Sequence, residues 1–111
     1  MTIVSLSLVV SAGAFARGLG APPAGRYACT VASNAGVAGN LRIVDGSHYR
    51  MNTSKVGVYA VRGRNLTFPS GIFHGVFKAR WSVSRTKRAE IVFTSLRNGL
   101  VTEKCSWKGK K

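Results

Sequence analysis

From residue 25 onward, apolar side chains recur at every second position, which is the period of a β-strand and not of a helix. The longest alternating segment runs from Gly75 to Ser84, where aromatic and aliphatic residues alternate with Lys, Arg and Ser. Turn signals interrupt the pattern, and the strongest are Asp45-Gly46 and Asn98-Gly99. The sequence therefore predicts an all-β domain of short strands joined by tight turns.

About eight strands are expected, each with its apolar residues on one face. Their ranges are 26–31, 40–44, 48–52, 57–62, 65–68, 75–84, 90–95 and 100–107. The inward side chains would be Tyr27, Cys29, Val31, Leu41, Ile43, Tyr49, Met51, Tyr59, Val61, Leu66, Phe68, Phe77, Ala79, Trp81, Val83, Ile91 and Phe93. Hairpin-linked strands of this kind are typical of a small antiparallel up-and-down barrel, with a β-sandwich as the alternative. Large residues would fill such a barrel, so we expect a packed core and no interior ligand.

Cys29 lies on the first expected strand and Cys105 on the last. Closure of a meander brings its first and last strands side by side, so the two residues would form a disulfide at the seam of the barrel. The pairing depends on export, because disulfides persist in oxidising compartments and are rare in the cytosol. No Cys or His cluster has the spacing of a metal site, and neither a metal nor a cofactor is expected.

The first residues predict export. An uncharged apolar run over residues 3–16 ends in Ala14 and Ala16, the A-x-A pattern of a signal-peptidase site, although no Lys or Arg precedes the run. The run is too short for a transmembrane helix. We expect a signal peptide over 1–16, cleaved after Ala16 or, as a second choice, after Ala21. A flexible Gly/Ala/Pro lead (17–24), the barrel domain (25–107) and a basic tail (108–111) would follow, in a periplasmic or extracellular protein without a transmembrane segment.

The charge is strongly one-sided, because 17 Lys and Arg face 3 Asp and Glu, for a net charge of +14. Such an excess attracts anionic partners, whereas a mixed-sign surface would suffice for solubility. The expected anion-binding residues are Arg42, Arg50, Arg62, Lys78, Arg80, Arg85, Lys87 and Arg88. Lipid head groups and acidic polysaccharides are the expected partners, and an acidic protein is a further candidate. Nucleic acid ranks lower, since only Phe73, His74 and Trp107 are expected to be exposed for stacking on bases.

Few residues suggest catalysis. His48, near Asp45, and His74 are candidate bases, but no nucleophile motif such as G-x-S-x-G is present. Alternation places Glu103 on the inward face with Cys105. Either Glu103 is an acid at the barrel mouth or one paired with an Arg, or a bulge shifts the register so that strict alternation does not apply to it. We favour the bulge. The chain is expected to be non-enzymatic, and no catalytic residue is assigned.

The order Gly-x-Tyr-x-Cys (Gly25 to Cys29), Gly-Ser-x-Tyr (Gly46 to Tyr49) and a closing cysteine resembles small exported bacterial barrels that are lipocalin-like in outline. The chain is also distantly similar to the periplasmic C-type lysozyme inhibitor family, whose fold is a disulfide-tied antiparallel barrel. The inhibitory Ser-Gly-x-x-Tyr loop of that family is matched most nearly by residues 70–74, with His74 at the Tyr position. Lysozymes of that type are basic and would repel this chain, so the resemblance implies, as an alternative function, an inhibitor or adaptor of an acidic exported hydrolase.

Overall fold

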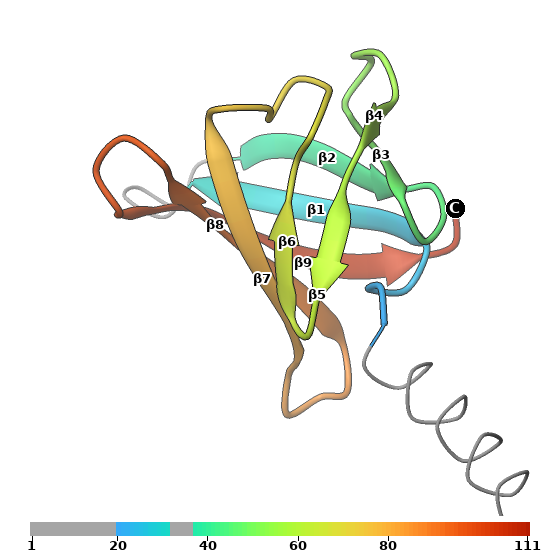
Figure 1. Cartoon of the computed structure of the whole chain (residues 1–111). Helices are drawn as coiled ribbons and strands as arrows, with labels where there is room; N and C mark the ends of the chain where they lie inside the picture. The colour runs from blue at the N-terminus through green and yellow to red at the C-terminus, as the bar shows by residue number, and fades with distance from the viewer. Residues whose placement is uncertain (1–19, 32–36) are drawn as a thin grey trace, which may run out of the picture.

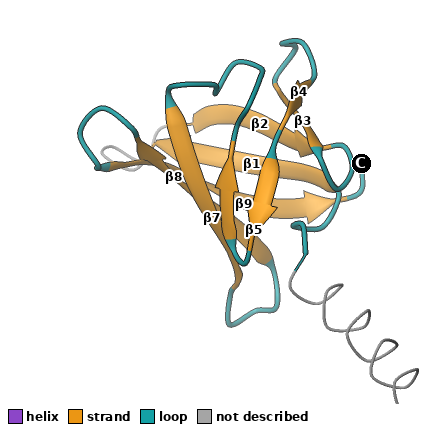
Figure 2. Cartoon of the chain, in the orientation of Figure 1, coloured by secondary structure: helices purple, strands orange, loops and turns teal. Residues whose placement is uncertain are grey.

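The computed structural model describes residues 20–31 and 37–111, so the predicted signal peptide over 1–16 lies outside the described residues. Nine antiparallel strands form one sheet that curls into a nearly closed barrel (Figures 1 and 2). The strands are β1 (Gly25–Val31), β2 (Val37–Ile43), β3 (His48–Met51), β4 (Gly57–Val58), β5 (Ala60–Arg62), β6 (Asn65–Thr67), β7 (Phe77–Val83), β8 (Ala89–Ser95) and β9 (Val101–Gly109). The described residues include no helix that is long and apolar enough to span a bilayer.

The sheet order is β4-β3-β2-β1-β9-β8-β7-β6-β5, so all strands adjacent in the chain pair except β4 and β5, and β1 additionally pairs with β9. The two edge strands, β4 and β5, are separated in the chain by Tyr59 alone. One extended segment, 57–62, therefore pairs with β3 at its start and with β6 at its end. The single strand expected over 57–62 is split by this change of partner, and the predicted up-and-down barrel is confirmed.

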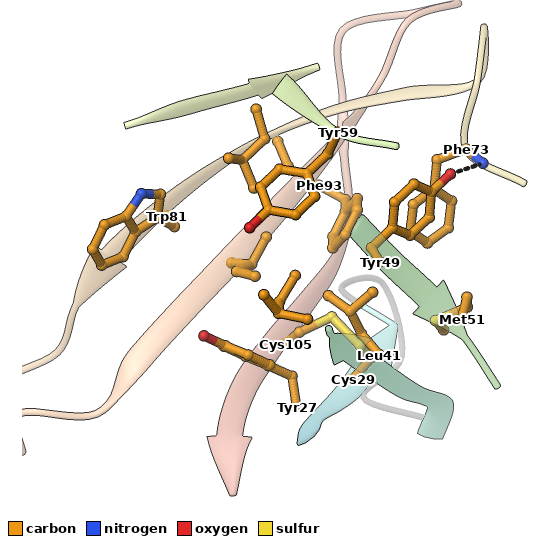
Figure 3. Packing of buried hydrophobic residues seen from close by; sticks show 14 of the residues in the cluster. Tyr27, Cys29, Leu41, Tyr49, Met51, Tyr59, Phe73, Trp81, Phe93 and Cys105 are labelled. Carbon is orange, nitrogen blue, oxygen red and sulfur yellow. Dashed lines mark hydrogen bonds between the residues drawn. A yellow bond between two sulfur atoms is a disulfide. The ribbon is translucent and has the colours of Figure 1, made fainter. Parts of the chain in front are cut away.

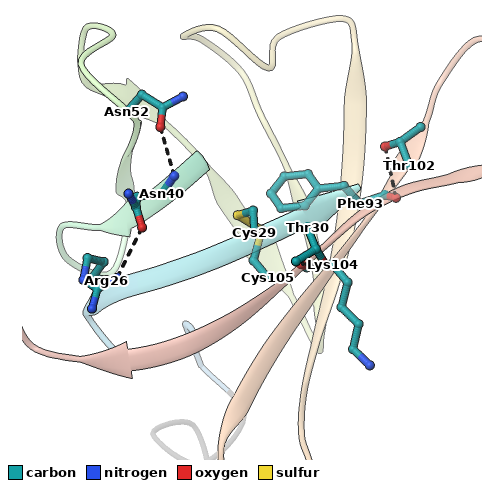
Figure 4. The surroundings of a disulfide bond; sticks show 9 residues. All are labelled: Arg26, Cys29, Thr30, Asn40, Asn52, Phe93, Thr102, Lys104 and Cys105. Carbon is teal, nitrogen blue, oxygen red and sulfur yellow. Dashed lines mark hydrogen bonds between the residues drawn. A yellow bond between two sulfur atoms is a disulfide. The ribbon is translucent and has the colours of Figure 1, made fainter. Parts of the chain in front are cut away.

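The disulfide lies on the seam where the meander closes. Cys29 on β1 and Cys105 on β9 are direct register partners, and their Cα atoms are 3.9 Å apart. Both side chains point into the barrel and are almost fully buried. The predicted Cys29–Cys105 bond is thus confirmed, and it joins the first strand of the chain, β1, to the last, β9 (Figure 4).

The interior is filled by side chains from every wall (Figure 3). The largest fully buried residues include Tyr27, Tyr49, Tyr59 and Phe93. Most residues expected to face inward do so, but Val83 was wrongly placed, because it is 51% exposed at the far end of β7. At one end of the barrel the rings of Tyr49, Phe68, Phe73, Phe77 and Phe93 form an aromatic cluster, with neighbouring ring centroids 4.9–5.8 Å apart.

The two ends of the barrel differ and are named here by what they carry. The terminal end holds both ends of the described chain and the turns at 44–47, 63–64 and 84–88, whereas the loop end holds the connections 52–56, 68–76 and 96–100. Residues 20–24, from the segment expected to be a flexible lead, run across the terminal end. The Trp81 and Trp107 ring N–H groups donate to the Gly20 and Ala24 carbonyls, both at 3.1 Å. Tyr27 donates its hydroxyl to the Pro23 carbonyl at 2.7 Å.

The loop end is covered by the 68–76 connection, because Phe73 turns inward. Phe73 was expected to be exposed and this is wrong: it is 4% exposed and stacks on Tyr49, with ring centroids 5.1 Å apart. The Tyr49 hydroxyl donates to the Ser70 carbonyl and accepts the Phe73 N–H, each at 2.9 Å (Figure 3). A Cβ on Gly57 would stand 2.7 Å from Gly71 Cα, so the two backbones pass too closely for any other residue at Gly57. The connection is thus held against the end of the barrel by both aromatic packing and backbone contact.

Removing the disulfide should strongly destabilise the barrel. The bond closes a loop of 76 residues, and in the chain-entropy model loss of such a constraint costs about 4–5 kcal/mol. We expect the Cys29→Ala/Cys105→Ala variant to show this loss in urea unfolding followed by tryptophan fluorescence. Wild-type protein in reductant is the control, and equal midpoints for oxidised protein and variant would contradict the role of the seam.

The Tyr49→Phe variant tests how the loop end is held. It leaves the Phe73 N–H without an acceptor among the described residues while preserving the ring, and an unsatisfied buried donor costs about 1–3 kcal/mol. We expect that loss in urea unfolding, together with faster amide exchange across residues 70–74. Unchanged exchange there would show that aromatic packing alone holds the connection.

Candidate anion-binding surface

Three arginines form a row across the outer faces of three adjacent strands. Arg26 on β1 is the register partner of Arg42 on β2, and Arg42 is in turn the partner of Arg50 on β3. Register partners have Cβ atoms about 4.5–5.5 Å apart, so the three side chains leave the sheet as immediate neighbours. We call these three residues the arginine row. They line a surface groove together with Asn40, Leu41, Asn52 and Thr53.

Each guanidinium of the row donates to a backbone or side-chain oxygen, and Arg42 has two such acceptors, one of which is the Lys111 backbone oxygen at 3.4 Å. Arg26 donates to the Asn40 side-chain oxygen at 3.2 Å, and the Asn40 backbone N–H donates to Asn52 at 2.9 Å (Figure 4). Arg42 donates to the Lys110 backbone oxygen at 3.1 Å. Arg50 donates to the Thr53 carbonyl at 3.5 Å. Because a guanidinium has five N–H donors, each arginine keeps several for a ligand.

No Asp or Glu side chain of the described residues pairs with the row. Within the described ranges two ion pairs are present, His48–Asp45 at 2.8 Å and Lys104–Glu90 at 3.6 Å, and neither touches the row. Like charges directly opposite each other in a sheet are destabilising. A bound anion would relieve this repulsion, and arginine suits phosphate and sulfate because its planar fork binds two oxygens at once.

A second basic group lies on the opposite wall. Lys78 and Arg80 share the outer face of β7, and Arg80 and Arg62 are both register partners of Asn65. In the sheet order β2 and β7 are separated by three strands in one direction and by β3, the 57–62 segment and β6 in the other. The second group therefore stands across the barrel from the row, and its groove is lined by Asn65, Leu66, Thr67, Lys78, Ala79, Arg80, Val92 and Thr94.

The remaining predicted residues, Arg85, Lys87 and Arg88, lie in the exposed β7–β8 turn. The structure thus divides the eight predicted residues among three places and brings only Arg42 and Arg50 together as direct neighbours. Arg26, which completes the row, was not among the predicted site residues. Strand alternation put it on the outer face, but only the pairing register shows that it stands beside Arg42.

His48 belongs to a polar cluster that resembles a catalytic triad in composition but not in geometry. Asp45 Oδ1 and Ser47 Oγ lie 2.8 and 3.2 Å from the same ring nitrogen, Nδ1. A triad needs the acid on one ring nitrogen and the nucleophile on the other. The Ser47 backbone N–H and the His48 ring together lower the pKa of the Asp45 carboxyl. The cluster therefore serves to close the β2–β3 turn. The other candidate base, His74, bonds through its ring Nδ1 to the Phe68 carbonyl at 2.9 Å.

Glu103 faces inward beside the disulfide, and our interpretation of its position was wrong. A bulge is present, because Phe93 pairs with Glu103 but the next residue, Thr94, pairs with Val101. The bulge turns Val101 outward to 51% exposure and leaves Glu103 on the inner face. Its carboxyl lies within 4.8 Å of both sulfurs, which as a disulfide offer no thiolate to a metal.

Burial of the carboxyl has an electrostatic cost. Glu103 Oε1 is buried and accepts no hydrogen bond from any residue in the described part of the chain. Desolvation raises the pKa of Glu103 above its usual value of 4.5.

Comparison of the chain with models of protein families, with curated proteins and with solved structures finds no match. The arginine row and its surroundings therefore supply the argument for function.

The Glu103→Gln variant should change how stability depends on pH. Because the folded pKa is raised, the stability associated with neutral Glu103 is complete below pH 4.5 and is lost as pH rises through the folded value. We expect the variant to melt above wild type at pH 7 and level with it at pH 3. The control is Glu90→Gln, whose outer-face carboxylate pairs with Lys104. A rise in melting temperature for both variants would show that the effect does not depend on burial of the Glu103 carboxyl.

Proposed function

We propose that this protein is an exported, non-enzymatic barrel whose arginine row binds the phosphate or sulfate groups of anionic envelope or extracellular material. The observation that carries the proposal is the row itself: three guanidinium groups adjacent across β1, β2 and β3, with no Asp or Glu partner among the described residues. Lipid head groups and acidic polysaccharides both supply such anions in repeated arrays.

The dimensions of the row favour an extended anionic array over a single small ion. Strands lie about 4.8 Å apart, so the row spans roughly 10 Å across the sheet. This is close to the Debye length at physiological salt, about 8 Å, so the three charges act together on one ligand. The groove continues to Asn52 and Thr53, which add polar groups at its far side.

Export is supported by two independent features. The Cys29–Cys105 bond is typical of proteins that mature in an oxidising compartment. The apolar run over 3–16 has the composition of a signal peptide. Both features support a periplasmic or extracellular location for the proposed ligand, where anionic lipids and polysaccharides are the abundant polyanions.

Two variants with equal loss of charge test the role of the row. Arg26→Gln/Arg42→Gln/Arg50→Gln removes the row, and Arg85→Gln/Lys87→Gln/Arg88→Gln removes three charges from the β7–β8 turn. On immobilised heparin, we expect the row variant to elute at clearly lower salt than the turn variant. The slope of log affinity against log salt concentration should be smaller in magnitude than that of wild type by about 2–3, since each phosphate-like contact contributes roughly 0.7–0.9 to it.

Equal losses in the two variants would mean that heparin senses net charge alone, and the proposed site would be rejected. Circular dichroism of both variants before chromatography excludes unfolding as the cause. Lipid A and a zwitterionic phospholipid, each on the same support, then distinguish a lipid phosphate from a polysaccharide sulfate as the preferred anion.

A further inference from the structure

Exposed aliphatic side chains gather at the loop end of the barrel. Nine large hydrophobic residues are exposed in the described chain, and six of them belong to the loop end. These six, Val56, Ile72, Val76, Leu96, Leu100 and Val101, are 46–63% exposed, and we call them the aliphatic rim. Single exposed aliphatic residues are ordinary, but a concentration at one end of a small protein marks an interaction surface.

Backbone contacts place the rim residues beside one another. The Leu96 N–H donates to the Val76 carbonyl at 3.0 Å, and the Ser95 N–H donates to the Leu100 carbonyl at 2.9 Å. The two connections that carry Val76 and the pair Leu96 and Leu100 thus meet on one side. On the other side, Gly57 passes directly against Gly71, which brings the neighbouring residues Val56 and Ile72 together. The rim therefore follows the mouth of the barrel across the top and left of Figure 1.

The charges around the rim are of one sign. Lys55 and Arg97 are exposed within the same connections, and Lys78 is exposed near the start of β7. Asp45 and Glu90 lie toward the terminal end, and Glu103 faces the interior. The described residues of the loop-end connections, 52–56, 68–76 and 96–100, contain no Asp or Glu. The surface is aliphatic, cationic and free of acidic groups.

We infer that the loop end docks on an anionic lipid bilayer, with the aliphatic rim entering the boundary between head groups and acyl chains. An apolar face flanked by Lys and Arg is the combination that binds anionic membranes, where burial of apolar area and attraction to head groups add together. An acidic polysaccharide matches the charge but offers nothing to the aliphatic side chains. A second copy matches the aliphatic side chains but carries the same +14 charge and is repelled.

This inference rests on the proposed function and adds the class of ligand and the orientation. The groove of the arginine row reaches Thr53, which lies in the same connection as Val56. A molecule seated by its rim therefore holds one end of that groove toward the head-group layer. The rim supplies the part of the binding that salt does not screen.

Cosedimentation with vesicles tests the inference. Wild type is expected to bind vesicles of phosphatidylglycerol and phosphatidylcholine, to bind weakly to phosphatidylcholine alone, and to keep part of its binding in about 1 M salt, where the Debye length is only about 3 Å. Ile72→Ser/Leu100→Ser should lose at least about tenfold in vesicle affinity, lose the salt-resistant part, and elute from heparin as wild type does. Val44→Ser/Val83→Ser, which removes two exposed aliphatic residues near the terminal end, should bind vesicles as wild type does.

Several results would overturn the inference. Equal vesicle binding by the rim variant and wild type would exclude insertion of the rim, as would equal losses in the rim and control variants. A wild-type dimer in sedimentation velocity that becomes a monomer in the rim variant would show that a second copy covers this surface. The proposed function fails separately, through the heparin behaviour of the arginine-row variant, so the two outcomes are distinguishable.

Discussion

Closure of the sheet along the β1–β9 seam is the constraint on which the rest of the structure depends. The chain forms a meander in which consecutive strands pair, except β4 and β5, which are joined directly by the chain. In such a meander the first and last strands are exposed edges unless they meet. Here they meet in a register that sets Cys29 against Cys105, with the disulfide on the inside. The same closure brings the side chains of all walls into one core and, apart from Glu103, leaves the charged residues of the strands on the outer face.

Both ends of the barrel are covered by its own chain, so the binding surfaces proposed above lie on its exterior. Residues 20–24 cross one end and the 68–76 connection covers the other, each held by side-chain hydrogen bonds from buried aromatic residues. The hydroxyl and indole groups that a wider barrel would present to a ligand donate instead to backbone carbonyls of this chain. Lipocalins bind in the barrel interior, whereas the binding surfaces proposed for this chain lie on strand faces and loops.

The strand positions could be predicted because they depend on local alternation of apolar and polar residues. The β1–β9 seam could be predicted because closure of a meander brings its first and last strands side by side. The residues that were misplaced share a different cause. Phe73 lies in a connection without alternation, and its inward turn depends on a hydroxyl from Tyr49, a residue distant in the chain. Glu103 was misjudged because a bulge can be expected from sequence but its exact residue cannot. The arginine row needs the register of three strands, which a single sequence does not contain.

The two ends of the described chain leave the barrel together, since Arg26 near the start of β1 is the register partner of Gly109 at the end of β9. In Figure 1 both lie on the right of the molecule, away from the 96–100 loop. A fusion partner or surface linker attached at either terminus is therefore joined to the same end of the barrel. The loop end of an immobilised molecule would then point away from the support. Immobilisation through a terminal tag therefore leaves the aliphatic rim accessible and suits surface-based binding measurements.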